Sequence, residues 1–132
     1  MSRLLLLFNH EWTAQQKTAA QQELQVESII VPPAEVKRLW GQIPADLPRL
    51  GDVLKPVGRW LESEGEAGDF VLIQGDFGAC FYMVQAAFRL KLIPIYATTR
   101  REASEIRLPD GTIQMTHCFR HVRFRRYERC DP

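Results

Sequence analysis

Short apolar runs alternate with longer amphipathic stretches along this chain, which is the pattern of successive β-α-β units. Four apolar runs predict strands: Arg3–Phe8, Val26–Val31, Asp69–Gln74 and Leu92–Tyr96. The unbroken apolar character of the first suits a strand that is covered on both faces. The stretches between them predict helices over residues 13–24, 33–40, 52–64 and 77–89, with a loop over 41–51. Thr13 and Gln16 have the spacing of a capping box, and Pro33 suits a first helical turn.

The end of the chain predicts an antiparallel hairpin. Asp110 and Gly111 form a turn signal between the runs 102–108 and 112–117, and the tail 119–129 (FRHVRFRRYER) alternates enough for a final strand. Together the elements predict one α/β domain over residues 1–132. We expect an open, mostly parallel sheet with helices on both faces and a C-terminal β-hairpin.

Composition is ordinary for a globular domain, with 132 residues, 45% hydrophobic and 25% charged. Such values exclude a disordered chain, a collagen-like repeat and a dense disulfide scaffold. The three cysteines, Cys80, Cys118 and Cys130, lack the spacing of a secreted framework, and the apolar run at residues 4–8 is too short to span a membrane. We therefore expect a cytoplasmic protein.

Charge is balanced overall but not along the chain. Residues 1–97 hold 9 Lys and Arg against 11 Asp and Glu, whereas residues 98–132 hold 8 against 5. An anionic partner would therefore meet mainly the last quarter of the chain.

Ligands of open α/β sheets bind beyond the carboxyl ends of the strands, so the residues that follow the strands are the candidates for a site. After the first strand come Asn9 and His10, and after the third comes the turn Gln74, Gly75, Asp76, Phe77 and Gly78. After the predicted end of the fourth come Thr98, Thr99, Arg100 and Arg101.

The QGDFGA turn at residues 74–79 has glycines between a buried strand and a helix, where a phosphate can approach backbone N–H groups. It matches neither GxGxxG nor GxxxxGK[ST], so dinucleotide or ATP chemistry is not expected. Asp76 suits a helix cap as well as a binding role. Phe77 suits either a packing contact or, if exposed, stacking on a base.

The ATTRR segment at residues 97–101 offers two hydroxyls and two guanidiniums, which suit a phosphodiester that gains charge. Its structural alternative is that the threonines begin a turn and Arg101 pairs with a carboxylate. His10 suits acid or base catalysis, phosphate binding or packing, and Asn9 suits a purine edge or a cap. Neither residue is specific alone.

The tail supports two weaker hypotheses. His117, Cys118 and His121 lie close in sequence, but they lack the further ligands of a zinc motif, and no metal site is expected. The arginines of the tail alternate with aromatic residues, a pattern that suits phosphate contacts or equally a solvated edge strand.

The chain resembles a small family of accessory proteins of type III CRISPR systems, the stand-alone ring nucleases with Csx-type names. The resemblance is carried by LLLLFNH at the start, QGDFGA in the middle, ATTRR after the predicted fourth strand and FRHVRFRRY at the end. The likeness lies in the order and spacing of these motifs over nearly the whole chain. It implies a CARF-like variant of the Rossmann fold that works as a homodimer. It also implies that a cyclic oligoadenylate, most often cyclic tetra-adenylate, binds across the two-fold axis and is cleaved, which switches off its effectors.

The resemblance points to Asn9, His10, the 74–78 turn, Thr98, Thr99 and Arg100. We expect metal-independent transesterification without a cofactor, in which Arg100 and Thr99 or Thr98 stabilise the charged phosphorane and His10 moves a proton. Asn9 and Gln74 are the candidates for recognising adenine. No membrane or DNA partner is expected.

Three alternatives remain open from the sequence. A binding protein would sequester the messenger without cleaving it, and the same loops would serve it. An RNA-binding or interaction module would use the arginine tail. A metal-dependent nuclease is disfavoured because the sequence has no clear carboxylate cluster.

Overall fold

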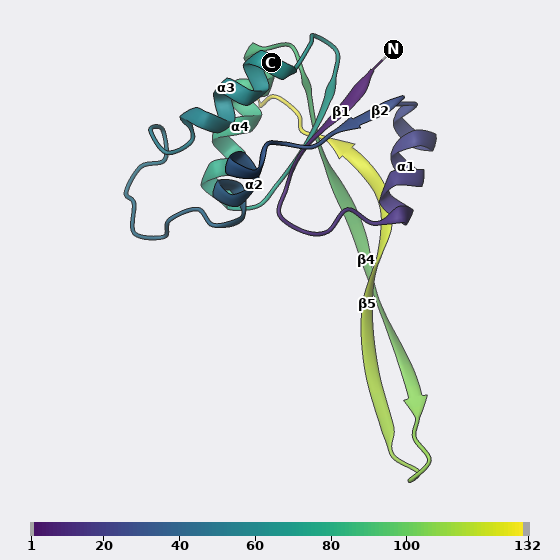
Figure 1. Cartoon of the computed structure of the whole chain (residues 1–132). Coiled ribbons are helices and arrows are strands. Elements are labelled where there is room, and N and C mark those ends of the chain that lie inside the picture. Colours follow the sequence, from purple (N-terminus) through teal and green to yellow (C-terminus); the bar gives the residue numbers. More distant parts are fainter. Residues whose placement is uncertain (1, 131–132) are drawn as a thin grey trace.

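A single five-stranded sheet with helices against both faces organises the chain in the computed structural model, which describes residues 2–130 (Figure 1). Its strands are β1 Arg3–Phe8, β2 Ser28–Ile30, β3 Phe70–Gln74, β4 Ile93–Arg107 and β5 Ile113–Arg126. Its helices are α1 Ala14–Leu24, α2 Ala34–Gly41, α3 Lys55–Glu64 and α4 Phe77–Arg89. The strand order is β2-β1-β3-β4-β5, with all pairs parallel except β4 with β5. The expected α/β class, mostly parallel sheet and C-terminal hairpin are confirmed.

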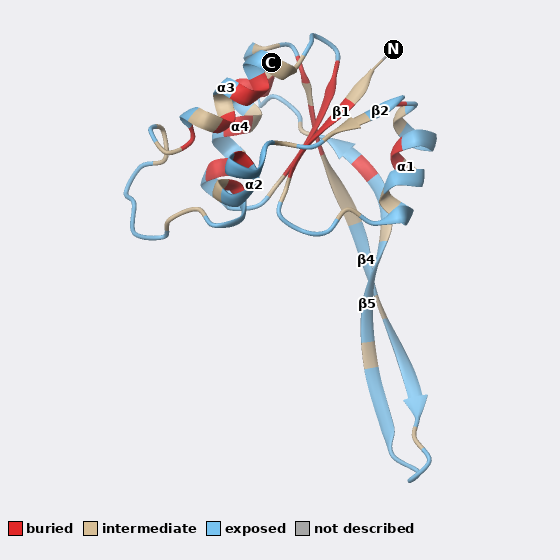
Figure 2. Ribbon diagram, viewed as in Figure 1, coloured by how far each residue is buried: buried red, intermediate tan, exposed pale blue. Residues whose placement is uncertain are grey.

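The unbroken apolar run of β1 is explained by burial on both sides. Leu5 and Leu7 pack in the core under α2, α3 and α4, while Leu4 and Leu6 pack on the face that α1 covers. Side chains alternate along a strand, so a strand between two helical layers is apolar at every position. Figure 2 shows the buried residues concentrated in these central strands and on the inner sides of the helices.

The two helical layers are unequal. Three helices cover one face of the sheet, whereas α1 alone covers the other (Figure 1). Thr13 caps α1, and its side chain and that of Gln16 form the predicted capping box. Because one helix is narrower than the sheet, part of the sheet face beyond α1 is left without helical cover.

At the amino-terminal ends of the strands, Arg3 forms ion pairs with Asp69 and Glu64. The Arg3 guanidinium lies 2.8 Å from Asp69, which is 4% exposed, and the Asp69 carboxylate also accepts the backbone N–H groups of Arg3 and Glu66. Burial opposes ionisation of Asp69, but these hydrogen bonds outweigh it and hold its pKa below the usual range. Asp69 therefore joins the start of β1 to the start of β3.

The end of the sheet differs from the prediction. The fourth strand does not stop at Tyr96 but continues to Arg107, so Thr98 to Arg101 lie inside a strand and do not follow one. The predicted segments 112–117 and 119–129 are likewise not separate, because most of both lies in one strand, β5, which runs from Ile113 to Arg126. The prediction was wrong because it took the end of the apolar run as the end of the strand. Ladder hydrogen bonds between β4 and β5 extend the strands beyond the core without burial.

Candidate functional site

The carboxyl ends of β1 and β3 lie side by side, because Phe8 is aligned with Gln74 in the sheet. The chain turns from β1 toward one edge of the sheet and from β3 toward the other, so the topological switch point lies between these strands. Asn9 and His10 follow β1 here and are exposed, and the His10 ring packs edge-on against Phe8 with centroids 5.5 Å apart. Gly75 follows β3 directly. The structure therefore brings together the first two groups of predicted site residues.

The side chain of Gln74 holds the sheet together at this edge. Its Oε1 accepts the backbone N–H of Ala97 at 2.8 Å and so continues the contact between β3 and β4 past their last backbone pair. The Gln74 carbonyl accepts the Trp40 indole N–H at 2.8 Å. A Cβ on Gly75 would lie 2.9 Å from the same indole nitrogen. Close packing of Trp40 is thus enough to explain the glycine at this position.

The first turn of α4 combines a cap with an unusually exposed ring. The Asp76 carboxylate accepts the backbone N–H of Ala79 at 2.9 Å, as the cap interpretation predicts. That carboxylate puts negative charge where a phosphate would approach the helix, so the turn offers an anion less than its glycines indicate. Phe77 is 95% exposed and makes no packing contact that a staple would require. Gly78 faces Leu50, in the loop before α3.

Thr98 is engaged in the backbone of the hairpin. A bulge interrupts the β4–β5 ladder between Thr98 and Thr99, and the Thr98 hydroxyl fills it by donating to the carbonyl of Arg123 at 3.1 Å and facing its N–H at 3.3 Å. Successive side chains of a strand point to opposite faces. Thr98 and Arg100 therefore share one face of β4, while Thr99 and Arg101 share the other.

Two arginines are paired in register across the hairpin, beyond the last residue of β3. Arg100 is aligned with Arg120 across the hairpin, and Arg120 lies 3.3 Å from Glu102. Among the residues that the structure describes, Arg100 has no carboxylate within ion-pair distance. Since Ala97 is level with Gln74, Arg100 lies three residues farther out, roughly 10 Å along the strand. Like charges directly opposite each other repel, and a bound anion would relieve that repulsion.

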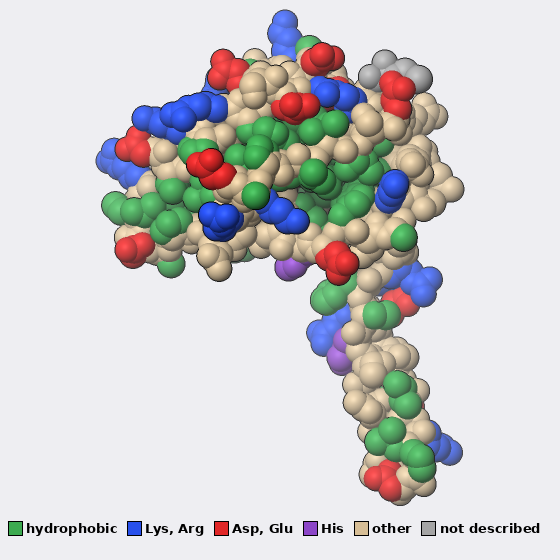
Figure 3. All heavy atoms as spheres, viewed as in Figure 1, with side chains coloured by type: hydrophobic (Ala, Val, Ile, Leu, Met, Phe, Trp, Pro, Cys, Tyr) green, Lys and Arg blue, Asp and Glu red, His purple; other side chains and the backbone are tan. Residues whose placement is uncertain are grey.

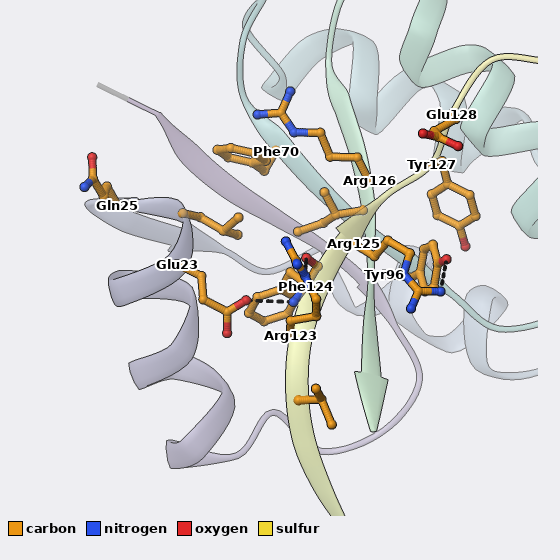
Figure 4. A pocket seen from close by; sticks show the side chains of 13 residues that line it. Glu23, Gln25, Phe70, Tyr96, Arg123, Phe124, Arg125, Arg126, Tyr127 and Glu128 are labelled. Atoms are coloured by element: carbon orange, nitrogen blue, oxygen red, sulfur yellow. Dashed lines mark hydrogen bonds between the residues drawn. The ribbon is translucent and has the colours of Figure 1, made fainter. Parts of the chain in front are cut away.

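A groove of about 1280 Å³ lies on the sheet face beside α1, and none of the predicted site residues lines it (Figure 4). Its apolar surfaces come from side chains such as Phe70, Ile95 and Phe124. The Arg126 guanidinium lies 5.8 Å from the Phe70 ring centre, and Arg125 lies 5.5 Å from that of Tyr96. Figure 3 shows hydrophobic side chains in a hollow of this face. The alternation of arginine and aromatic residues in the tail was the sequence signal for this groove.

The wall of the groove is held by a contact between α1 and β5. His121 Nε2 lies 2.8 Å from one oxygen of Glu23, whose other oxygen accepts the backbone N–H of Phe124 at 2.7 Å. On the other wall, the Tyr127 hydroxyl donates to the Ile73 carbonyl at 2.7 Å, and burial raises the Tyr127 pKa to about 12. The tail is therefore anchored to the body on both sides.

The side chains of His117, Cys118 and His121, considered above as zinc ligands, do not point toward one another. His117 and His121 point to one face of β5, and Cys118 points to the other. The His121 ring is already in contact with the Glu23 carboxylate. Within residues 2–130, no group of three or more His, Cys, Asp or Glu side chains is arranged to hold a metal ion.

Comparisons with known proteins bear on the whole chain. No helix in the described part of the chain has the length and apolar character needed to cross a membrane. No solved structure matches the chain. It is 43% identical over 127 residues to "Uncharacterized protein MJ1673" of Methanocaldococcus jannaschii, an alignment that covers 96% of this chain and 98% of the relative. Residues 2–125 also match the sequence profile of the "Uncharacterized protein MJ1673 family". With nearly its full length matched by both, the chain belongs to the MJ1673 family.

Proposed function

We propose that this protein is a cytoplasmic ring nuclease with a CARF-like sheet, which binds a cyclic oligoadenylate and cleaves it without a metal. The ring would bind at the carboxyl-terminal ends of the parallel strands, here called the carboxyl edge of the sheet. Cyclic tetra-adenylate is the favoured ring. The observation that carries the proposal is the cross-strand pair Arg100 and Arg120, just beyond the strand ends that present Asn9 and His10. Within residues 2–130, no carboxylate forms an ion pair with Arg100. Such a pair suits the phosphates of a ring whose bases reach the β1–β3 edge.

The reaction that fits these residues is an internal transesterification. A ribose 2′-oxygen attacks its adjacent phosphorus and loses its proton, and the bond from phosphorus to the 5′-oxygen breaks. The 5′-oxygen takes up a proton, which leaves a 2′,3′-cyclic phosphate and a 5′-hydroxyl. The substrate carries its own nucleophile, so the protein needs mainly to align it and to stabilise the phosphorane.

The geometry narrows the roles of the predicted residues. Arg100 is the proposed donor to the charged phosphorane, and His10 the proposed group that moves a proton. Thr99 points away from Arg100, and the Thr98 hydroxyl is bound within the bulge, so neither supports Arg100 directly. Of the two candidates for adenine recognition, Asn9 is exposed, whereas Gln74 keeps only its amide N–H groups available.

The test is incubation of the purified protein with cyclic tri-, tetra- and hexa-adenylate in EDTA, with products identified by liquid chromatography and mass spectrometry. We expect one ring to become linear oligoadenylates with cyclic-phosphate ends. Arg100→Ala should slow the reaction about 100-fold or more while binding is retained. Arg59→Ala removes the same charge from the exposed surface of α3 and serves as the control. Unchanged turnover in Arg100→Ala would remove Arg100 from the catalytic role.

Two other outcomes identify different functions. Tight binding with the ring recovered intact would replace cleavage by sequestration. The groove beside α1 favours a second candidate, binding of single-stranded RNA by the tail, because arginines and aromatic rings alternate along it. That function predicts affinity for linear RNA that falls steeply with salt and shows little preference for a ring.

A further inference from the structure

The hairpin leaves the body of the molecule as an arm, here defined as residues 101–119. Its ladder runs from the pair Arg101 and Phe119 to the pair Arg107 and Ile113, about 20 Å along the strands. Figure 1 shows the arm extending outward from the carboxyl-terminal ends of the parallel strands. Figure 2 shows it exposed along almost all of its length. An isolated two-stranded hairpin is marginally stable in water. An arm of this length therefore calls for a partner.

One face of the arm carries most of its exposed hydrophobic side chains. Ile113, Met115 and Phe119 lie on one face of β5 and are 54%, 51% and 70% exposed. Their cross-strand partners on the same face are Arg107, Glu105 and Arg101. On the other face, the hydroxyls of Ser104 and Thr116 lie 2.6 Å apart. Figure 3 shows hydrophobic side chains on the outer half of the arm. The arm thus exposes three hydrophobic side chains, interspersed with charged ones, and nothing in the described part of the chain covers them.

The body carries a second apolar patch that is also uncovered. Phe77 and Phe81 are one turn apart on α4 and are 95% and 72% exposed, so they share one side of the helix. Within one chain, α4 makes no contact with β5. Two sets of exposed hydrophobic side chains therefore exist on the same molecule, and the fold keeps them apart.

We propose that the arm of one copy of this chain packs Ile113, Met115 and Phe119 against Phe77 and Phe81 of a second copy, and that the second copy returns the contact. An isologous two-fold pairing of this kind satisfies all four surfaces at once. The three phenylalanines alone expose on the order of 900 Å² in two copies, taking about 200 Å² for a free ring, and a stable interface buries about 1,200–2,000 Å² in total. Ile113 and Met115 supply much of the remainder.

The charge of the arm favours a protein partner over a nucleic acid. Arg101 and Arg107 are outnumbered by Glu102, Glu105 and Asp110, so the arm lacks the positive stripe that RNA requires. Both the arm and the start of α4 lie at the carboxyl edge of the sheet. The pairing would therefore turn the two carboxyl edges, each with Arg100 and His10, toward one shared space. The pairing itself stands apart from the proposed function and needs no ligand.

Sedimentation velocity tests the association. We expect the wild-type chain to be a dimer. Two variants, Met115→Ser with Phe119→Ser and Phe77→Ser with Phe81→Ser, should each raise the dimer dissociation constant about 30-fold or more, because buried aromatic residues dominate such interfaces. All four residues are exposed, and circular dichroism will show that the variants keep their fold. Ser104→Ala, on the opposite face of the arm, is the control. A wild-type chain that stays monomeric at a protein concentration of about 100 μM would overturn the proposal.

Cross-linking tests which surfaces meet. A photoreactive p-benzoyl-phenylalanine in place of Phe119 should cross-link to residues around 77–85 of the other copy, identified by mass spectrometry on a mixture of labelled and unlabelled chains. The same group in place of Ser104 should give little of this product. Cross-links to the partner's arm or to the groove beside α1, or equal yields from both positions, would contradict the docking of the arm on α4.

Discussion

At the scale of single residues, Asp69 gives the clearest stability prediction. Asp69→Asn leaves Arg3 without its main partner at the amino edge and should lower the free energy of unfolding by about 3 kcal/mol at neutral pH. Because the folded state lowers the Asp69 pKa, its contribution is full above the unfolded pKa of about 4 and is lost as pH falls through the folded value. Urea denaturation between pH 3 and 7 should therefore show the difference between the two proteins narrowing as the pH falls below about 4.

The exposed pair of Asp52 and Lys55 is the matched control for that experiment. Their side chains are 98% and 62% exposed, so Asp52→Asn should change stability by less than about 0.5 kcal/mol. A difference between wild type and Asp69→Asn that stays constant down to pH 3 would argue against the ion pair as its cause.

At the scale of elements, a substitution in the turn from β3 to α4 can distinguish whether Gly75 serves packing or ligand binding. Gly75→Ala would put a methyl group 2.9 Å from the Trp40 indole, so α2 has to shift and the hydrogen bond from Trp40 to Gln74 lengthens. We expect a loss of about 1–3 kcal/mol in urea denaturation without any ligand present. Unchanged stability with impaired binding of the ring would instead assign this glycine to the ligand.

At the scale of the whole molecule, the arm should contribute to association and little to the fold of the body. Replacing residues 102–118 by a short Asn-Gly turn removes no residue of either core cluster. We therefore expect a folded monomer with the circular dichroism of an α/β protein and cooperative unfolding. The Asn-Gly turn still connects the two strands next to Arg100. A variant that fails to fold would therefore show that the arm itself stabilises the body.

The sequence alone determined the order and type of the elements in the body. Buried strands with both faces covered require runs such as Leu4–Leu7, and the Thr13 capping box and the Asp76 cap are local, so neighbouring residues are enough to specify them. It also determined that Asn9, His10 and the turn at 74–78 lie at one edge, because parallel strands share a direction.

Only the tertiary structure decided the length of β4 and β5, the faces on which Thr99 and Arg100 lie, and the use of Gln74 and Thr98 as internal contacts. The groove beside α1 and the separation of the arm from α4 were decided there as well. The physical reason is the same for all of these features. Hydrophobic periodicity records burial within a segment, whereas ladder pairing, a bulge and the uncovered part of a sheet depend on residues far apart in the chain.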